Sequence, residues 1–159
     1  MADEVRTTVV SAIMTTQIEM VAQSTPIRFV AELMMTKQIG GLPVTDDEGT
    51  VVGVITAADL LGAVPRLSRP PGGSPQTGGF YADLSPSVRL TPGLVDGLSE
   101  GTVQDYMSKL VVSVPVDATV RHAAQVMTDV GVHRVIVLDK FGNLAGLLTA
   151  SDIVRHVAG

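Results

Sequence analysis

Two stretches of the sequence decide the fold because they repeat one pattern: Gly53-Val54-Ile55-Thr56-Ala57-Ala58-Asp59 and Gly146-Leu147-Leu148-Thr149-Ala150-Ser151-Asp152. They lie 93 residues apart, and the same shift aligns further positions without a gap. Identical pairs under this shift include Val10 with Val103, Met14 with Met107, Val21 with Val114, Arg28 with Arg121 and Met34 with Met127. An internal duplication sets the architecture of a chain. We therefore expect two copies of one unit of roughly 55 residues, each with too little core to be stable alone.

Each copy has the pattern of a strand, a helix, two strands and a final helix. The expected strands are residues 18–21, 42–45 and 51–56 in the first copy, and 134–138 and 144–149 in the second. Ser24 and Asp117 align with each other, and both are good N-caps for the first helix of their copy. Apolar residues at i, i+3, i+4 and i+7 predict one buried face on each of these helices: Ile27, Val30, Ala31 and Met34, and Val120, Ala123, Ala124 and Met127. Gly40 and Gly131 approximately mark the helix ends, and the final helices are expected at 57 to about 61 and 150 to about 157.

The copies are predicted to occupy residues 8–62 and 101–158, with an insertion at 63–100 that is rich in Pro and Gly. A loop of this length in a compact domain is usually either functional or disordered. The insertion also carries apolar residues that can anchor it: Phe80, Tyr81, Leu84, Val88, Leu90, Leu94 and Leu98. We interpret it as a long excursion that packs back onto the protein. A plain tether is the alternative.

Composition excludes several classes of function. The net charge of -5 argues against sequence-independent binding of nucleic acid, which needs Lys and Arg to replace counterions. The absence of cysteine excludes a disulfide scaffold, a cysteine nucleophile and a thiolate zinc site. The three histidines, His122, His133 and His156, form no closely spaced ligand pair, so we expect no metal site.

The same composition favours a cytoplasmic homodimer. The sequence has no apolar run long enough to span a membrane, and its acidic start lacks the apolar region of a signal peptide. Charged residues make up 17% of the chain and apolar residues 45%. We expect this apolar excess to fill a large core and a subunit interface.

The repeated motif lies where a strand is expected to lead into a helix. Gly53 and Gly146 lack a side chain, which lets a ligand or another backbone approach closely. Thr56 and Thr149 are placed as N-caps of helices whose first N–H groups and dipole suit a phosphate. The Asp three residues later has the acceptors to bind the two hydroxyls of a ribose. The alternative is a capping box, in which the acid bonds back to the cap. The motif by itself leaves both interpretations open.

Together these features resemble a tandem pair of CBS domains, also called a Bateman module. The resemblance covers the chain except its N-terminal tip and the insertion. It is carried by the β-α-β-β-α order, by the lead-in segments that end in Met14 and Met107, and by the duplicated motif. The apolar second strands, Leu42-Pro43-Val44 and Val135-Ile136-Val137, also match. The resemblance implies an α/β fold of two CBS repeats packed with pseudo-twofold symmetry.

The resemblance also implies a ligand: AMP, ADP, ATP or a related S-adenosyl or NAD-like compound, bound without a covalent link in clefts between the repeats. In such proteins the motif Thr meets phosphate or ribose and the Asp meets the ribose hydroxyls. Carried over, these roles fall on Thr56, Asp59, Thr149 and Asp152. Apolar residues of the first and second strands would line the adenine: Ile18, Val21, Pro43, Val111, Val114 and Ile136.

The two copies differ where their second strand begins. The second copy has His133-Arg134 at this place and the first has Gly40-Gly41. Arg offers a fixed fork of donors that matches phosphate, and His gains charge as the pH falls. We expect clefts of different charge if Arg134 faces one of them. The alternative is that Arg134 is an ordinary solvated surface cation.

The sequence therefore favours a stand-alone regulatory module with no catalysis of its own, read by an effector protein that the sequence does not identify. Thr and Asp at a helix start have neither a general base nor an activated nucleophile beside them. A dimeric scaffold protein with empty or vestigial clefts is the second hypothesis. A nucleic-acid-associated regulator is the third, and the acidic balance argues against it.

Overall fold

The computed structural model describes residues 2–64, 79–82 and 90–159, and these divide into two compact units. The repeat-1 unit takes residues 19–64, 79–80 and 90–111. The repeat-2 unit takes residues 2–18, 81–82 and 112–159. Neither unit is one continuous stretch of chain, and we describe each by itself.

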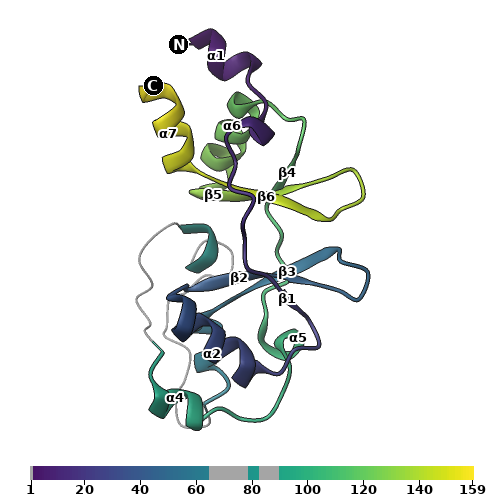
Figure 1. The fold of residues 1–159 in the computed structure, drawn as a ribbon, viewed down its shortest axis with the longest axis vertical. Coiled ribbons are helices and arrows are strands. Elements are labelled where there is room, and N and C mark those ends of the chain that lie inside the picture. Colours follow the sequence, from purple (N-terminus) through teal and green to yellow (C-terminus); the bar gives the residue numbers. More distant parts are fainter. Residues whose placement is uncertain (1, 65–78, 83–89) are drawn as a thin grey trace. The chain divides into compact units, whose positions relative to one another are not determined.

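The repeat-1 unit holds a three-stranded sheet of β1 (Val21–Ala22), β2 (Gly41–Thr45) and β3 (Val51–Thr56), in that order (Figure 1). β1 runs parallel to β2, and β2 is antiparallel to β3. The parallel pair is joined by α2 (Ile27–Lys37), and β3 leads directly into α3 (Ala57–Leu61). The shorter helices α4 (Pro92–Asp96) and α5 (Val103–Tyr106) follow later in the chain.

The repeat-2 unit holds a second sheet with the same topology, made of β4 (Ser113–Pro115), β5 (Arg134–Leu138) and β6 (Leu144–Thr149). Here α6 (Val120–Val130) joins the parallel pair, and β6 leads into α7 (Ala150–Ala158). The unit also takes in the start of the chain, α1 (Ala2–Thr7) and the 3-10 turn η1 (Val10–Ala12). Helix α1 contacts α6, although the two are far apart in sequence (Figure 1). The expected α/β fold of two β-α-β-β-α repeats is confirmed.

The predicted helix faces are buried, whereas some predicted ends are wrong. Seven of the eight predicted face residues are buried, and Ala124 is half-buried. Ser24 and Asp117 are not the caps: α2 begins after Pro26 without a side-chain cap, and the Thr119 hydroxyl caps α6. Gly131 ends α6 in the left-handed region as expected, but Gln38, at φ 55°, ends α2 in place of Gly40.

The first strand was also misplaced, since β1 begins at Val21 and the structure leaves Ile18 outside it. The strands at 51–56, 134–138 and 144–149 agree residue for residue with the prediction. The strand expected at 42–45 begins one residue earlier, at Gly41.

The lead-in segment of each copy pairs with the third strand of the other copy. Thr15 exchanges two backbone hydrogen bonds with Leu147, each 2.9 Å. Ser108 exchanges two with Val54, also 2.9 Å each. The motif glycines make these approaches possible. A Cβ on Gly53 would collide with the Ser108 carbonyl oxygen, and one on Gly146 would lie 2.9 Å from the Thr15 carbonyl oxygen. Of the two explanations for these glycines, the structure shows close approach of another backbone.

The described parts of the insertion pack against the two units. Val95 and Leu98 are buried in the core of the repeat-1 unit. Phe80, in the 3-10 turn η2 (Gly79–Ala82), is also buried, and its ring lies 3.1 Å from the place of a Cβ on Gly41. Tyr81 is buried in the repeat-2 unit. The expected anchors Leu84 and Val88 lie outside the described residues.

Candidate functional site

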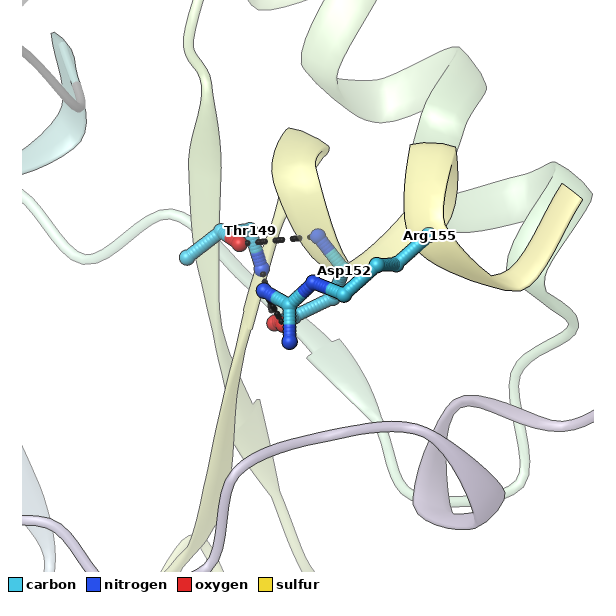
Figure 2. Close-up of polar contacts among 3 residues, drawn as sticks. All are labelled: Thr149, Asp152 and Arg155. Atoms are coloured by element: carbon cyan, nitrogen blue, oxygen red, sulfur yellow. Dashed lines mark hydrogen bonds and ion pairs between the residues drawn. The ribbon is translucent and has the colours of Figure 1, made fainter. Parts of the chain in front are cut away.

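The motif of the second repeat lies at the junction of β6 and α7, where its polar side chains bond to each other and to the backbone (Figure 2). The Thr149 hydroxyl accepts the backbone N–H of Asp152 at 3.1 Å. The Asp152 carboxylate accepts the backbone N–H of Thr149 through Oδ2 at 2.9 Å. This is a complete capping box, so the capping interpretation describes the contacts of this motif in the structure.

The first repeat repeats this geometry at the junction of β3 and α3. The Thr56 hydroxyl accepts the N–H of Asp59 at 3.2 Å, and Asp59 Oδ2 accepts the N–H of Thr56 at 2.9 Å. A third capping box lies elsewhere, at the start of α5, where Asp105 Oδ2 accepts the N–H of Thr102 at 3.0 Å. The duplicated motif is therefore one of several capping boxes in this protein. Its position directly after the last strand of each sheet, and not the capping, is what distinguishes it.

Arg134 lies next to the motif of the second repeat. It is the residue directly opposite Thr149 in the antiparallel β5–β6 pair, so both side chains leave the same face of the sheet. A backbone hydrogen bond lies beside this pair: the N–H of Ala150 donates to the His133 carbonyl oxygen at 2.8 Å. The first repeat has Gly41 opposite Thr56. In the repeat-2 unit an arginine thus pairs across the β-ladder with the motif threonine, where the first repeat has a glycine.

The six predicted lining residues are divided between the units. Val114 and Ile136 are buried on the adjacent strands β4 and β5 of the repeat-2 unit. Val21 and Pro43 are buried on β1 and β2 of the repeat-1 unit. Two lead-in residues are exchanged: Ile18 belongs to the repeat-2 unit and Val111 to the repeat-1 unit. Both are half-buried.

Sequence reasoning missed Arg155, which lies one turn after Asp152 on α7. Its guanidinium Nη2 is 3.2 Å from Asp152 Oδ1, so both oxygens of that carboxylate have a donor (Figure 2). The sequence alone could have pointed to this residue, because the shift of 93 residues aligns Arg155 with Gly62 and so marks a difference between the two repeats.

Tyr81 was expected only as an anchor of the insertion, yet it also contacts the backbone near His133. Its carbonyl oxygen accepts the His133 N–H at 2.7 Å, and its hydroxyl accepts the Val112 N–H at 3.0 Å. Burial raises the pKa of Tyr81 to about 12, although the Val112 hydrogen bond opposes this shift. The phenol therefore stays protonated throughout the physiological range.

The described residues contain no group of three or more His, Asp or Glu side chains placed to hold a metal ion. None of the helices in the described part of the chain has the length and apolar character that crossing a membrane requires. The chemistry that the junctions offer is hydrogen bonding and charge: hydroxyl and carboxylate acceptors, and at one of them two arginines.

Comparison with known proteins places this geometry in a family. The protein CBSX2 of Arabidopsis thaliana, described as chloroplastic and CBS domain-containing, is 30% identical over 141 residues, 87% of this chain and 58% of that protein. The 5'-AMP-activated protein kinase subunit gamma of Kluyveromyces lactis is 31% identical over 140 residues, 84% of this chain and 35% of that subunit. The chain thus spans little more than half of one of these relatives and about a third of the other.

A solved structure shows the same fold. The crystal structure of CBSX2 in complex with AMP superposes with a TM-score of 0.65 at 25% identity, covering 95% of this chain and 96% of that one. The family model for the CBS domain matches residues 10–66 and 103–159, which together make up most of the chain. The resemblance inferred from the duplicated motif is thereby confirmed, and the chain belongs to the CBS domain family.

Proposed function

We propose that the protein is a regulatory module that binds an adenine nucleotide or a related adenosyl ligand at its strand–helix junctions and has no catalysis of its own. The observation that carries the proposal is the corner of the repeat-2 unit where Arg134 lies directly opposite Thr149, next to the start of α7. The AMP complex of the related CBSX2 supports the same class of ligand.

Each group at this corner has a role in the proposal. The first N–H groups of α7 and the Arg134 guanidinium would meet phosphate, since both are suited to anions. Asp152 would accept ribose hydroxyls. An ionised carboxylate has about four lone-pair sites, so the capping hydrogen bond leaves acceptor capacity. Asp59 would do the same in the first repeat. The apolar residues on the first and second strands, with Ile18 and Val111, would contact the adenine.

A thermal shift experiment tests the proposal with AMP, ADP, ATP, adenosine, S-adenosylmethionine and NAD as separate probes. A ligand that binds only the native state stabilises it by about 2.7 kcal/mol at a hundredfold excess over Kd. We expect the melting temperature to rise by roughly 2–8 °C with at least one probe. Mass spectrometry of small molecules released from natively purified protein would identify the ligand. No shift with any probe would contradict the proposal and favour a dimeric scaffold protein with empty clefts.

Substitution of the motif carboxylates separates ligand binding from capping. Asp59→Asn combined with Asp152→Asn should abolish the shift, because the amide replaces a charged ribose acceptor with a neutral group. Asp105→Asn is the control, since Asp105 Oδ2 accepts the backbone N–H of Thr102 at the start of α5, outside the two duplicated motifs. It should lose some stability, as expected for one cap where the double variant loses two, and keep the ligand-induced shift. A shift that survives in the double variant would contradict the ribose role.

We further propose that the module is a cytoplasmic homodimer that signals to an effector protein. Large apolar side chains are exposed on three helices: Phe29 on α2 at 57%, Val130 on α6 at 46% and Val154 on α7 at 66%. Isolated exposed apolar side chains are common, but several on helices favour an interface. Light scattering at tens of micromolar protein should give the mass of a dimer, and a monomer would contradict this part of the proposal.

A further inference from the structure

Arg155 holds one oxygen of the carboxylate that the proposed function assigns to ribose. Its Nη2 lies 3.2 Å from Asp152 Oδ1, and Oδ2 is taken by the backbone N–H of Thr149 (Figure 2). The side chain of Asp152 is 10% exposed, whereas that of Arg155 is 77% exposed. The guanidinium therefore reaches the carboxylate from the solvent side.

The residue that makes this contact differs between the repeats. The position that corresponds to Arg155 in the first repeat is Gly62, which has no side chain to approach Asp59. The helices differ as well, because α7 continues to Ala158 while α3 ends at Leu61. The two junctions thus differ in the residue that lies one turn after the acid.

Folding alone does not account for the ion pair. An exposed Arg–carboxylate pair contributes little to stability, because water screens it and two side chains lose freedom. The capping box is complete without Arg155, since Thr149 and Asp152 already satisfy each other's backbone N–H groups. The guanidinium uses one of its five N–H donors on Asp152 in this contact, and it can turn toward another anion at small cost.

We propose that Arg155 sets the ligand preference of the second repeat, favouring a phosphorylated ribose over an uncharged one. An uncharged ribose must compete with Arg155 for Asp152 Oδ1, and it gives the displaced guanidinium no new partner. A ribose that carries a phosphate displaces Arg155 in the same way, but its phosphate then accepts the guanidinium. The inference rests on the proposed function and names the residue that makes the second site selective for nucleotides over nucleosides.

Loss of Arg155 and loss of Arg134 are expected to affect adenosine binding differently. Arg134 lies across the β-ladder from Thr149, so its loss would remove a phosphate partner and leave adenosine binding unchanged. Loss of Arg155 would remove a phosphate partner and also free Oδ1 for the ribose. Only the loss of Arg155 is therefore expected to change the affinities for AMP and for adenosine in opposite directions.

The test is isothermal titration of the full chain with AMP and with adenosine, for the wild type, Arg155→Ala and Arg155→Lys. Arg155→Ala should weaken AMP binding about tenfold, as expected for loss of a charge-assisted hydrogen bond, and should strengthen adenosine binding. Arg155→Lys should retain part of the preference, because it keeps the charge without the fork. Arg121→Ala, which removes an exposed arginine from α6, is the control and should change neither affinity.

The same titrations separate this inference from the proposed function. Equal changes for AMP and adenosine in Arg155→Ala, or no change, would overturn the inference and leave the proposed function standing. A wild type that binds no adenosyl compound would overturn both.

Discussion

The substitution Gly53→Ala tests the exchange of lead-in segments most directly. A Cβ at this position would collide with the carbonyl oxygen of Ser108, which is backbone and cannot rotate away. Ser108 and Val54 share two hydrogen bonds of 2.9 Å, and both would weaken as the segment withdraws. Each contributes about 1 kcal/mol net, and overpacking costs about 1–3 kcal/mol more. We expect a total loss of about 2–5 kcal/mol from a stability of about 5–15 kcal/mol.

Gly146→Ala should cost less, about 1–3 kcal/mol. Its Cβ would meet the flexible side chain of Met14, with Sδ at 2.5 Å, before the Thr15 carbonyl oxygen at 2.9 Å. Gly93→Ala is the control, because its Cβ would meet only the Thr91 hydroxyl at 3.9 Å and lies within α4. Removing a helical glycine should leave stability unchanged or raise it by up to about 1 kcal/mol.

Urea unfolding followed by circular dichroism measures these differences. With an m-value of about 1–3 kcal/mol/M, the midpoint of Gly53→Ala should fall by about 1 M or more, and Gly146→Ala should lie between it and Gly93→Ala. If Gly53→Ala unfolds at the same midpoint as Gly93→Ala, the close approach of the Ser108 backbone does not stabilise the protein. A larger loss for Gly146→Ala would contradict the argument that a flexible side chain yields more easily than backbone.

Three further predictions concern the pH range, the caps and the minimal fragment. Because the folded pKa of Tyr81 is raised to about 12 from an ordinary 10.0, its contribution is complete below pH 10 and is lost as the pH rises to 12. The wild type should therefore lose stability faster than Tyr81→Phe in that window, by about 1.4 kcal/mol per pKa unit, and parallel curves from urea unfolding would refute it. Thr149→Ala should cost about 0.5–2 kcal/mol in ligand-free protein, since it removes the cap of α7, and an unchanged melting temperature would argue against the cap. A fragment of residues 1–62 should fail to fold cooperatively in calorimetry, because it lacks residues 101–111 that pair with β3 and pack beside α2; a cooperative monomer would disprove this.

Local patterns predicted much of this fold because they are strong where the chain is most regular. The strands at 51–56, 134–138 and 144–149 are apolar runs bounded by turn residues, and their limits match the structure. Helix caps were harder to predict, because several candidates lie close together. Thr119 lies two residues after the predicted Asp117, and in the structure the threonine makes the hydrogen bond.

Non-local pairing left no periodic signal to detect. The bridges of Thr15 with Leu147 and of Val54 with Ser108 join residues far apart in sequence, and each involves a segment too short to show alternation. The site followed the same division. The sequence predicted Thr149 and Asp152 at a strand–helix junction, as observed. The ion pair of Arg155 with Asp152 was not predicted, because it depends on α7 extending far enough to place the two side chains one turn apart. The ligand roles of the twelve site residues stay predictions.

The exchange of lead-in segments has a consequence for synthesis on the ribosome. Thr15 emerges well before Leu147, so this bridge cannot form until the residues between them have been made. The sheet of the repeat-1 unit likewise waits for Ser108. The segment around Thr15 therefore waits for its partner strand while the residues between the two are translated. A circularly permuted gene that begins at Glu19 and ends at Ile18 would make each unit nearly continuous and, because local contacts form faster, should shorten that delay.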